Sequence, residues 1–398
     1  MAAYLQRWIY TLIALLLGAV GLNYWVDPYG LYRSREAGDW KPHAATQGDL
    51  VKPYLVLRHP PRTLILGNSR AEVGFDPEDP AWPEAARPVF NLALPGTGTR
   101  VARRLFEHVL AVHTPQAVVL GVDYMDFLVE LGARGSDPRM TRRLLLDAVY
   151  PASVRWWQRL HDAAATLASL DALIHSLDTL RVAGRPGVPD LTEAGFNPMR
   201  DYREIARREG YFNLFRQRDL ENIRAYQRRP KNLFTRGTGS SPAFDDLNAI
   251  LDAARTRAIP VQVVIYPYHA HLLEILRLTG HWELFEDWKR ELAHRVASHG
   301  RGRAMLWDFS GYHVYAREPV PAAGNRKQTL QWYWEAGHFK SELGHLVLSR
   351  LHGAGPDTFG TVLTPENVET HLEQIRADAE AFRREHAQVV AELASLVR

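Results

Sequence analysis

Residues 63–70 read Thr-Leu-Ile-Leu-Gly-Asn-Ser-Arg, a short apolar run that ends in a turn with a serine. Two further apolar runs follow, Pro-Val-Phe-Asn-Leu-Ala-Leu at 88–94 and Ala-Val-Val-Leu-Gly-Val-Asp at 117–123, and residues 99–113 between them have helical character. Short apolar runs that alternate with helices are typical of buried parallel strands. The sequence therefore predicts an α/β domain built on a parallel sheet.

The same alternation returns in the second half of the chain, after a segment of a different kind. Residues 128–242 have helical periodicity and few strand signals, so we expect a helical insertion. The α/β domain is then formed by residues 61–127 and 243–352. Its second part is expected to contain helices and strands at 245–258, 261–266, 271–298, 304–308 and 341–351. A final amphipathic helix is expected within 353–398, beginning at Thr364-Pro-Glu.

Composition narrows the possible functions. The chain has 398 residues, of which 46% are apolar and 23% charged, as in ordinary folded proteins. It has no cysteine, which excludes disulfides, thiolate metal sites and a cysteine nucleophile. Its net charge of +3 is too small to indicate a nucleic-acid partner. His269 and His271 lack a third placed ligand, so we expect neither a metal nor another cofactor.

The N-terminus contains the one segment suited to a membrane. After a tail of residues 1–7, residues 8–26 carry no charge and would form a helix of about 28 Å, close to the hydrocarbon thickness of a bilayer. Aromatic residues stand at both ends of the run, as in an interfacial belt. We expect a transmembrane anchor at 8–26; the alternative is a signal peptide cleaved near Ala19-Val-Gly. Residues 27–60, rich in proline, glycine and charge, are expected to form a stalk or a wrapping segment.

Polar residues that could carry chemistry follow the predicted strands. In an open α/β sheet, sites lie beyond the carboxyl ends of the strands. Ser69 follows the first strand, Gly96 the second, and Glu335 and His338 precede the last helix of the domain. A serine becomes a nucleophile when an imidazole removes its proton and a carboxylate orients that imidazole. We therefore expect Ser69 as nucleophile, His338 as base, Glu335 as its orienting acid and the Gly96 N–H as an oxyanion donor.

Four further residues stand at strand ends and are candidates for oxyanion stabilisation or substrate binding. They are Arg70, Asp123, His269 and Asp308. The arginines crowded between residues 200 and 229 are instead expected to form a solvated helix face.

Gly-x-Ser after the first strand, a glycine after the second, and an acid three residues before a late histidine resemble the SGNH (GDSL-like) hydrolase superfamily. The chain is similar to its membrane-anchored AlgX/AlgJ-like and DltD-like members, over roughly residues 60–127 and 243–352. The resemblance implies a flavodoxin-like α/β/α fold and acyl-ester chemistry on a cell-surface polysaccharide, as an esterase or O-acetyltransferase. It also implies an inner-membrane anchor with the catalytic domain in the periplasm, and a partner such as a membrane protein that transfers acyl groups.

Three positions depart from that resemblance. Glu335 stands where the superfamily has the aspartate that precedes the histidine by three residues, a mild change because glutamate can also orient a histidine. Asn68 stands where the superfamily has aspartate, and residues 121–123 (Gly-Val-Asp) lack the asparagine that completes the oxyanion hole. An ionised Asp123 cannot donate a hydrogen bond. The alternative function is therefore a catalytically inactive carbohydrate-binding or scaffold protein of a polysaccharide assembly complex.

Overall fold

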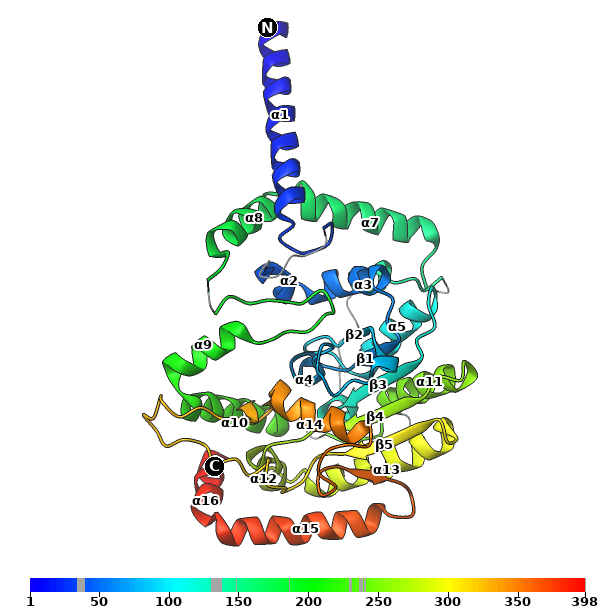
Figure 1. Ribbon diagram of the computed structural model, residues 1–398, viewed down its shortest axis with the longest axis vertical. Coiled ribbons are helices and arrows are strands. Elements are labelled where there is room, and N and C mark those ends of the chain that lie inside the picture. Colours follow the sequence, from blue (N-terminus) through cyan, green and yellow to red (C-terminus); the bar gives the residue numbers. More distant parts are fainter. Residues whose placement is uncertain are drawn as a thin grey trace.

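A six-stranded, mostly parallel sheet forms the centre of the protein (Figure 1). The computed structural model describes residues 1–33, 40–129, 138–147, 149–185, 187–228, 231–235, 239 and 241–397. Spatial order along the sheet is β2-β1-β3-β4-β5-β8, with the first five strands parallel and β8 antiparallel to β5. The strands are β1 (Thr63–Leu66), β2 (Val89–Asn91), β3 (Ala117–Val122), β4 (Val261–Ile265), β5 (Ala304–Asp308) and β8 (Thr361–Leu363).

Helices between the strands cover the sheet, so the predicted α/β class is confirmed. Every residue of β1 and β2 is buried, as expected for strands enclosed on both faces. Helix α11 contacts α5 on one side and α13 on the other, and α4 contacts α14. The helices that follow the strands are α4 (Ser69–Gly74), α5 (Thr99–Leu110), α12 (Ala270–Leu278), α13 (Trp282–Gly300) and α14 (Ser341–Leu351), with α11 (Pro242–Thr256) before β4.

Two short strands outside the main sheet precede α14. They are β6 (Tyr333–Glu335) and β7 (His338–Phe339), which pair antiparallel across a tight turn. No strand was expected here, because strands of only three and two residues are too short to produce an apolar pattern. This β6–β7 hairpin holds Glu335 and His338 at its two sides.

The predicted insertion is helical where the structure describes it. Helices α7 and α8 lie across the foot of α1, and α9 and α10 run back toward the sheet (Figure 1). The helices are α6 (Pro138–Arg143), α7 (Ala152–Leu167), α8 (Leu170–Val182), α9 (Arg200–Glu209) and α10 (Tyr211–Gln227). Two short 3₁₀ turns, η1 (Glu84–Ala86) and η2 (Tyr124–Phe127), lie in the α/β domain.

The described residues of the expected stalk, 27–33 and 40–60, wrap the domain. The described part contains α2 (Pro42–Thr46) and α3 (Gly48–Arg58), and α3 buries Val51 and Leu55 in the main core. Lys52 on α3 is fully buried, forms an ion pair of 2.8 Å with Glu72 on α4, and donates to the Ala93 carbonyl. The proline-rich and charged composition of this segment did not indicate that its apolar side chains would be buried in the core.

The C-terminal region is more divided than expected. In place of one helix from Thr364, strand β8 extends the sheet and two helices follow, α15 (Val368–Glu385) and α16 (Ala387–Val397), separated at His386. The expected helix at 271–298 is likewise divided into α12 and α13 by a turn in which Gly280 has φ +76°, a conformation that suits glycine.

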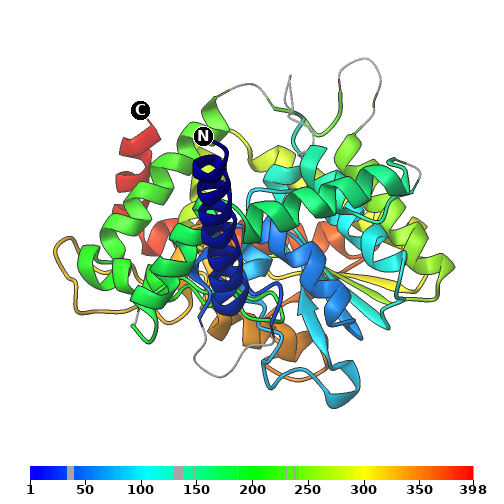
Figure 2. The same cartoon turned by 90° about the horizontal axis from the view of Figure 1, so that it is seen from above.

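The first helix, α1 (Ala2–Val26), stands out from the rest of the protein (Figures 1 and 2). Among the described residues it is the one helix long and apolar enough to cross a membrane, with a mean hydropathy of 1.8 and little burial. A signal sequence has the same properties. Asn23 near its end is buried: its amide donates to the Leu167 carbonyl and accepts from the Ser176 hydroxyl. The foot of α1 is therefore held between α7 and α8.

Candidate active site

A strained turn between β1 and α4 presents Ser69. Gly67 has φ +149°, and a Cβ on it would lie 2.5 Å from the Tyr266 hydroxyl and 2.9 Å from Ala71 Cβ, so a larger residue does not fit. The Asn68 side chain then accepts a hydrogen bond of 3.0 Å from the Arg70 N–H and caps the helix. Ser69, the first residue of α4, is left half-buried at the carboxyl end of β1.

The β6–β7 hairpin brings a histidine to this serine. Ser69 Oγ lies 2.8 Å from His338 Nε2, and the other ring nitrogen, Nδ1, is hydrogen-bonded to Glu335 Oε1. With Glu335 ionised, Nδ1 carries the proton and Nε2 accepts from the serine hydroxyl. The three predicted residues are thus in series, hydroxyl to imidazole to carboxylate.

Glu335 is held as a carboxylate. Its side chain is 1% exposed, and Oε2 accepts a hydrogen bond of 2.6 Å from the Gly337 N–H and lies 3.1 Å from Arg218 Nε. Burial alone would raise the pKa of Glu335, but His338, Arg218 and the Gly337 N–H together hold that pKa at about 2. The acid is therefore ready to stabilise a protonated His338.

Arg70 and Asp123, both expected at the oxyanion or substrate site, form an ion pair with each other. The Arg70 guanidinium forms an ion pair with the buried Asp123 carboxylate, and Arg70 Nε donates to the Gly337 carbonyl at 2.6 Å. Asp123 also caps η2 by accepting from the Met125 N–H. Arg70 thereby joins the end of β3 to the turn of the β6–β7 hairpin, so it positions His338 through the backbone, and neither charge is free for substrate.

Gly96 lies in an exposed loop after β2. The Leu94 N–H donates to the Gly67 carbonyl at 3.1 Å, which sets this loop beside the serine turn. Gly96 has φ +67°, and its N–H donates to no acceptor among the described residues. A Cβ at Gly96 would meet no atom within 4 Å, so the space beside it is open.

His269 and Asp308 are not brought to the serine. His269 is buried, with Nε2 donating to the Glu318 carbonyl and Nδ1 accepting from the His271 N–H, and burial holds its pKa well below the usual range. Asp308 is buried on the far side of β4. Burial would raise its pKa, but Lys289 at 2.7 Å and His371 at 2.9 Å hold it well below the usual range. Neither side chain hydrogen-bonds to Ser69, and His269 instead lines the cavity described below, so their expected role in substrate binding stays a prediction.

Two residues near the relay were not foreseen. Arg218, on α10, belongs to the arginine-rich region expected to be a solvated face; Arg207 and Arg208 fit that expectation, but Arg218 pairs with Glu335. Asp126, in η2, accepts from the Asn68 amide at 3.0 Å. Burial raises the pKa of Asp126 to about 7, although Arg70 and Asn68 oppose the rise. Neither carries a local sequence signal, because each reaches the site from an element outside the sheet.

The structure contains a cavity of about 580 Å³, lined by residues of α10, the start of α12, the 317–323 loop, the end of α15 and α16. Ser69 and His338 are not among the residues that line it. Within the described part of the chain, no group of three His, Asp or Glu side chains is placed to hold a metal ion. His271 and Asp219, 2.9 Å apart in this cavity, form a simple pair.

Taken together, the site is a serine hydroxyl, an imidazole and a buried carboxylate at the carboxyl edge of a parallel sheet. This arrangement activates a serine for attack on a carbonyl carbon. Comparison with models of known protein families finds no match, and comparison with curated proteins also finds none. The function is therefore inferred from the residues of this chain.

Proposed function

We propose that the protein is an SGNH-like serine esterase or O-acetyltransferase, anchored in the inner membrane with its catalytic domain in the periplasm, that acts on a cell-surface polysaccharide. The Ser69–His338–Glu335 series is the observation that carries the proposal. The strand order 2-1-3-4-5 of the parallel part of the sheet also agrees with the flavodoxin-like α/β/α fold that the SGNH resemblance implies.

The chemistry would proceed in two halves. Ser69 Oγ attacks the carbonyl carbon of an ester while its proton passes to His338 Nε2, and Glu335 stabilises the imidazolium. The ester bond then breaks, and His338 gives the proton to the departing alkoxide. In the second half, water or a sugar hydroxyl gives a proton to His338 and attacks the carbonyl carbon of the acyl-enzyme. The bond between the acyl group and Ser69 Oγ then breaks, His338 returns the proton to Oγ, and the acyl group leaves on the attacking oxygen. Water yields an esterase, and a sugar hydroxyl yields a transferase.

The expected oxyanion hole has few hydrogen-bond donors. The Gly96 N–H is an available donor beside the serine turn, and the Ser69 N–H, at the start of α4, is a second candidate. Asp123, at the position where the superfamily has asparagine, is ionically paired with Arg70 and offers no donor. Because the loss of one oxyanion donor costs about 10²–10³ in rate, we expect slow turnover of simple esters.

The same observation favours a second candidate function. An activated serine without a full oxyanion hole suits a carbohydrate-binding or scaffold protein of a polysaccharide assembly complex that retains a hydrolase fold. The two candidates differ in one respect: only the enzyme forms an acyl-serine. A membrane partner that transfers acyl groups is consistent with the anchor in the first candidate.

The test uses the full chain in detergent or vesicles with p-nitrophenyl acetate. We expect turnover that Ser69→Ala abolishes. Ser298→Ala, an exposed serine on α13 whose hydroxyl only contacts its own helix, is the matched control and should retain full rate. Equal turnover by wild type and Ser69→Ala would overturn the enzyme. Absence of turnover in both, with measurable binding of acetylated oligosaccharides, would favour the scaffold.

A further inference from the structure

Helices α7 and α8 turn their apolar side chains outward. On α7, Trp156, Trp157 and Leu160 are exposed, with Trp157 65% exposed. On α8, Leu170 and Ile174 are exposed, with Leu170 70% exposed, and Leu177 and Leu180 continue the same apolar surface. Soluble proteins rarely leave so many large apolar side chains together in water. The α7–α8 surface, defined by these seven residues, therefore requires a covering.

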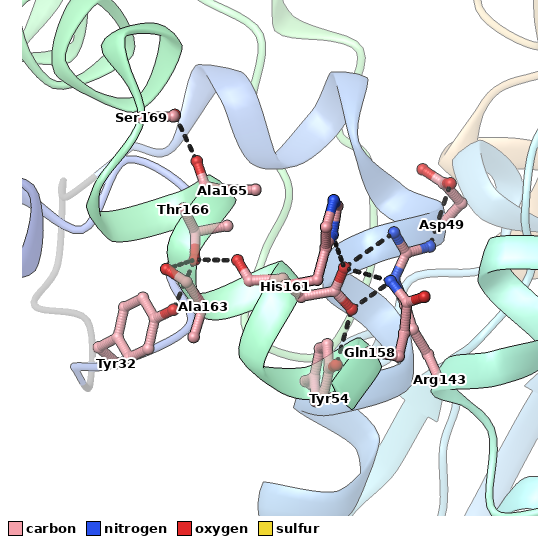
Figure 3. Close-up of polar contacts among 11 residues, drawn as sticks. Tyr32, Asp49, Tyr54, Arg143, Gln158, His161, Ala163, Ala165, Thr166 and Ser169 are labelled. Atoms are coloured by element: carbon pink, nitrogen blue, oxygen red, sulfur yellow. Dashed lines mark hydrogen bonds and ion pairs between the residues drawn. The ribbon is translucent and has the colours of Figure 1, made fainter. Parts of the chain in front are cut away.

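The inward face of the same helices is polar. Asp162 on α7 accepts hydrogen bonds from Arg143, Gln158 and Tyr54, at 2.7–2.8 Å for the closest contact of each, and Thr166 bonds the Tyr32 hydroxyl (Figure 3). On α8 the buried side chains are small, namely Ala172, Ser176 and Thr179. An amphipathic helix of a soluble domain normally buries its apolar face. These two helices instead expose their apolar face and bury their polar face, as expected of helices whose apolar face contacts lipid.

The position of α1 identifies the covering. The α7–α8 turn contacts α1 at Asn23, through hydrogen bonds to Leu167 and Ser176, and α1 rises from this surface (Figures 1 and 2). The uncharged run covers residues 8–26, but the part of it before the buried Asn23, residues 8–22, spans only about 22 Å, less than the roughly 30 Å hydrocarbon thickness of a bilayer. A bilayer crossed by α1 must therefore extend to the level of the α7–α8 surface.

Aromatic and basic side chains at that level fit a lipid interface. Tyr24 and Trp25 are exposed at the foot of α1, and Trp156 and Trp157 are exposed on α7, which lies across that foot (Figure 1). Such amphipathic rings gather at the boundary between hydrocarbon and headgroups. Arg159 and Arg181 are exposed on the two helices, where long basic side chains can reach lipid phosphates.

We propose that the α7–α8 surface is immersed in the interfacial layer of the bilayer that α1 crosses, so that the domain rests on the membrane. The protein is then held at two places, by a spanning helix and by a hairpin lying in the membrane plane. This inference needs α1 to remain uncleaved, but it does not depend on the chemistry of Ser69.

The absence of native cysteine makes the test direct. Single cysteines are introduced by Leu160→Cys and Leu177→Cys in the full chain, labelled with an environment-sensitive fluorophore, and reconstituted in phosphatidylglycerol–phosphatidylethanolamine vesicles. Val112→Cys and Val314→Cys, which replace exposed apolar residues outside α7 and α8, are matched controls. Leu15→Cys, on the exposed part of α1, reports whether the anchor spans.

We expect nitroxide-bearing lipids to quench the labels at 160, 177 and 15 severalfold more than those at 112 and 314, with the opposite order for aqueous iodide. Labels at 160 and 177 that respond like those at 112 and 314, while the label at 15 is quenched by lipid, would overturn the proposal and leave a protein partner as the covering. If the label at 15 is also not quenched by lipid, α1 does not anchor the chain and the proposal falls with it.

Discussion

The buried Glu335 allows the strongest quantitative prediction. Glu335→Gln keeps the shape of the side chain and removes its charge. The lowering of its pKa from 4.5 to about 2 means that His338, Arg218 and the Gly337 N–H together stabilise the ionised carboxylate by about 3 kcal/mol net of burial, at about 1.36 kcal/mol per pKa unit. Loss of that charge removes the group that stabilises the imidazolium formed in the transition state, and we expect a cost of at least about 10² in rate. A glutamine that donates to Nδ1 would also hold His338 in the wrong tautomer, which raises the loss toward about 10⁴.

The assay is ester turnover by the full chain. We expect Glu335→Gln to lower kcat by about 10²–10⁴ with little change in KM, because the carboxylate acts on the imidazolium of the transition state. Glu221→Gln is the matched control, since Glu221 is the other, more exposed partner of Arg218, and it should lose less than about threefold. A Glu335→Gln enzyme within threefold of wild type would refute the role assigned to the carboxylate.

Stability gives an independent reading of the same substitution. A carboxylate with a lowered pKa stabilises the folded protein above the unfolded value, near 4.5, and this contribution is lost as pH falls toward about 2. We expect wild type to unfold at higher denaturant concentration than Glu335→Gln near neutral pH, with the gap closing in acid. A gap that is independent of pH would contradict the assigned charge state.

Three further predictions follow from single contacts. Arg70→Lys removes the link between Asp123 and the Gly337 carbonyl. It should lower kcat at least tenfold, a rise of about 1.4 kcal/mol in the activation free energy, with KM nearly unchanged. A change in KM alone would indicate that Arg70 binds substrate instead. Lys52→Met leaves Glu72 buried without its cation and should destabilise the protein by about 3–5 kcal/mol in chemical denaturation, whereas Lys52→Met with Glu72→Gln should recover most of it. Burial raises the pKa of Asp126 from 3.8 to about 7, so the stability of the folded protein falls as the pH rises from about 4 through about 7 and this carboxyl loses its proton. Asp126→Asn should therefore stabilise the protein more near pH 9 than near pH 5. Equal effects at the two pH values would argue against a buried carboxyl.

The parallel sheet and the proximity of Ser69, His338 and Glu335 were predictable because their sequence signals are local. Each strand is a short apolar run, and Ser69 directly follows the first of them. Glu335 and His338 are three residues apart, so their pairing depended on one turn. Such local signals can be interpreted without knowing which distant elements pack against each other.

The supporting contacts were not predictable, because they join elements far apart in the sequence. Arg218 reaches Glu335 from α10, and Lys52 reaches Glu72 from a segment whose composition resembled a stalk. Arg70 and Asp123 stood correctly at strand ends, but their opposite charges neutralise each other once the strands are adjacent. Asp308 also follows a strand, but its carboxylate is paired with Lys289 and His371, which come from elements distant in the sequence.

If His338 activates Ser69, the full chain should react with a fluorophosphonate at that serine alone, which mass spectrometry of the proteolysed protein would locate. We expect a single adduct on the peptide that contains Ser69, absent in Ser69→Ala and strongly slowed in His338→Ala. An adduct elsewhere, or labelling of Ser69 that does not depend on His338, would contradict this activation.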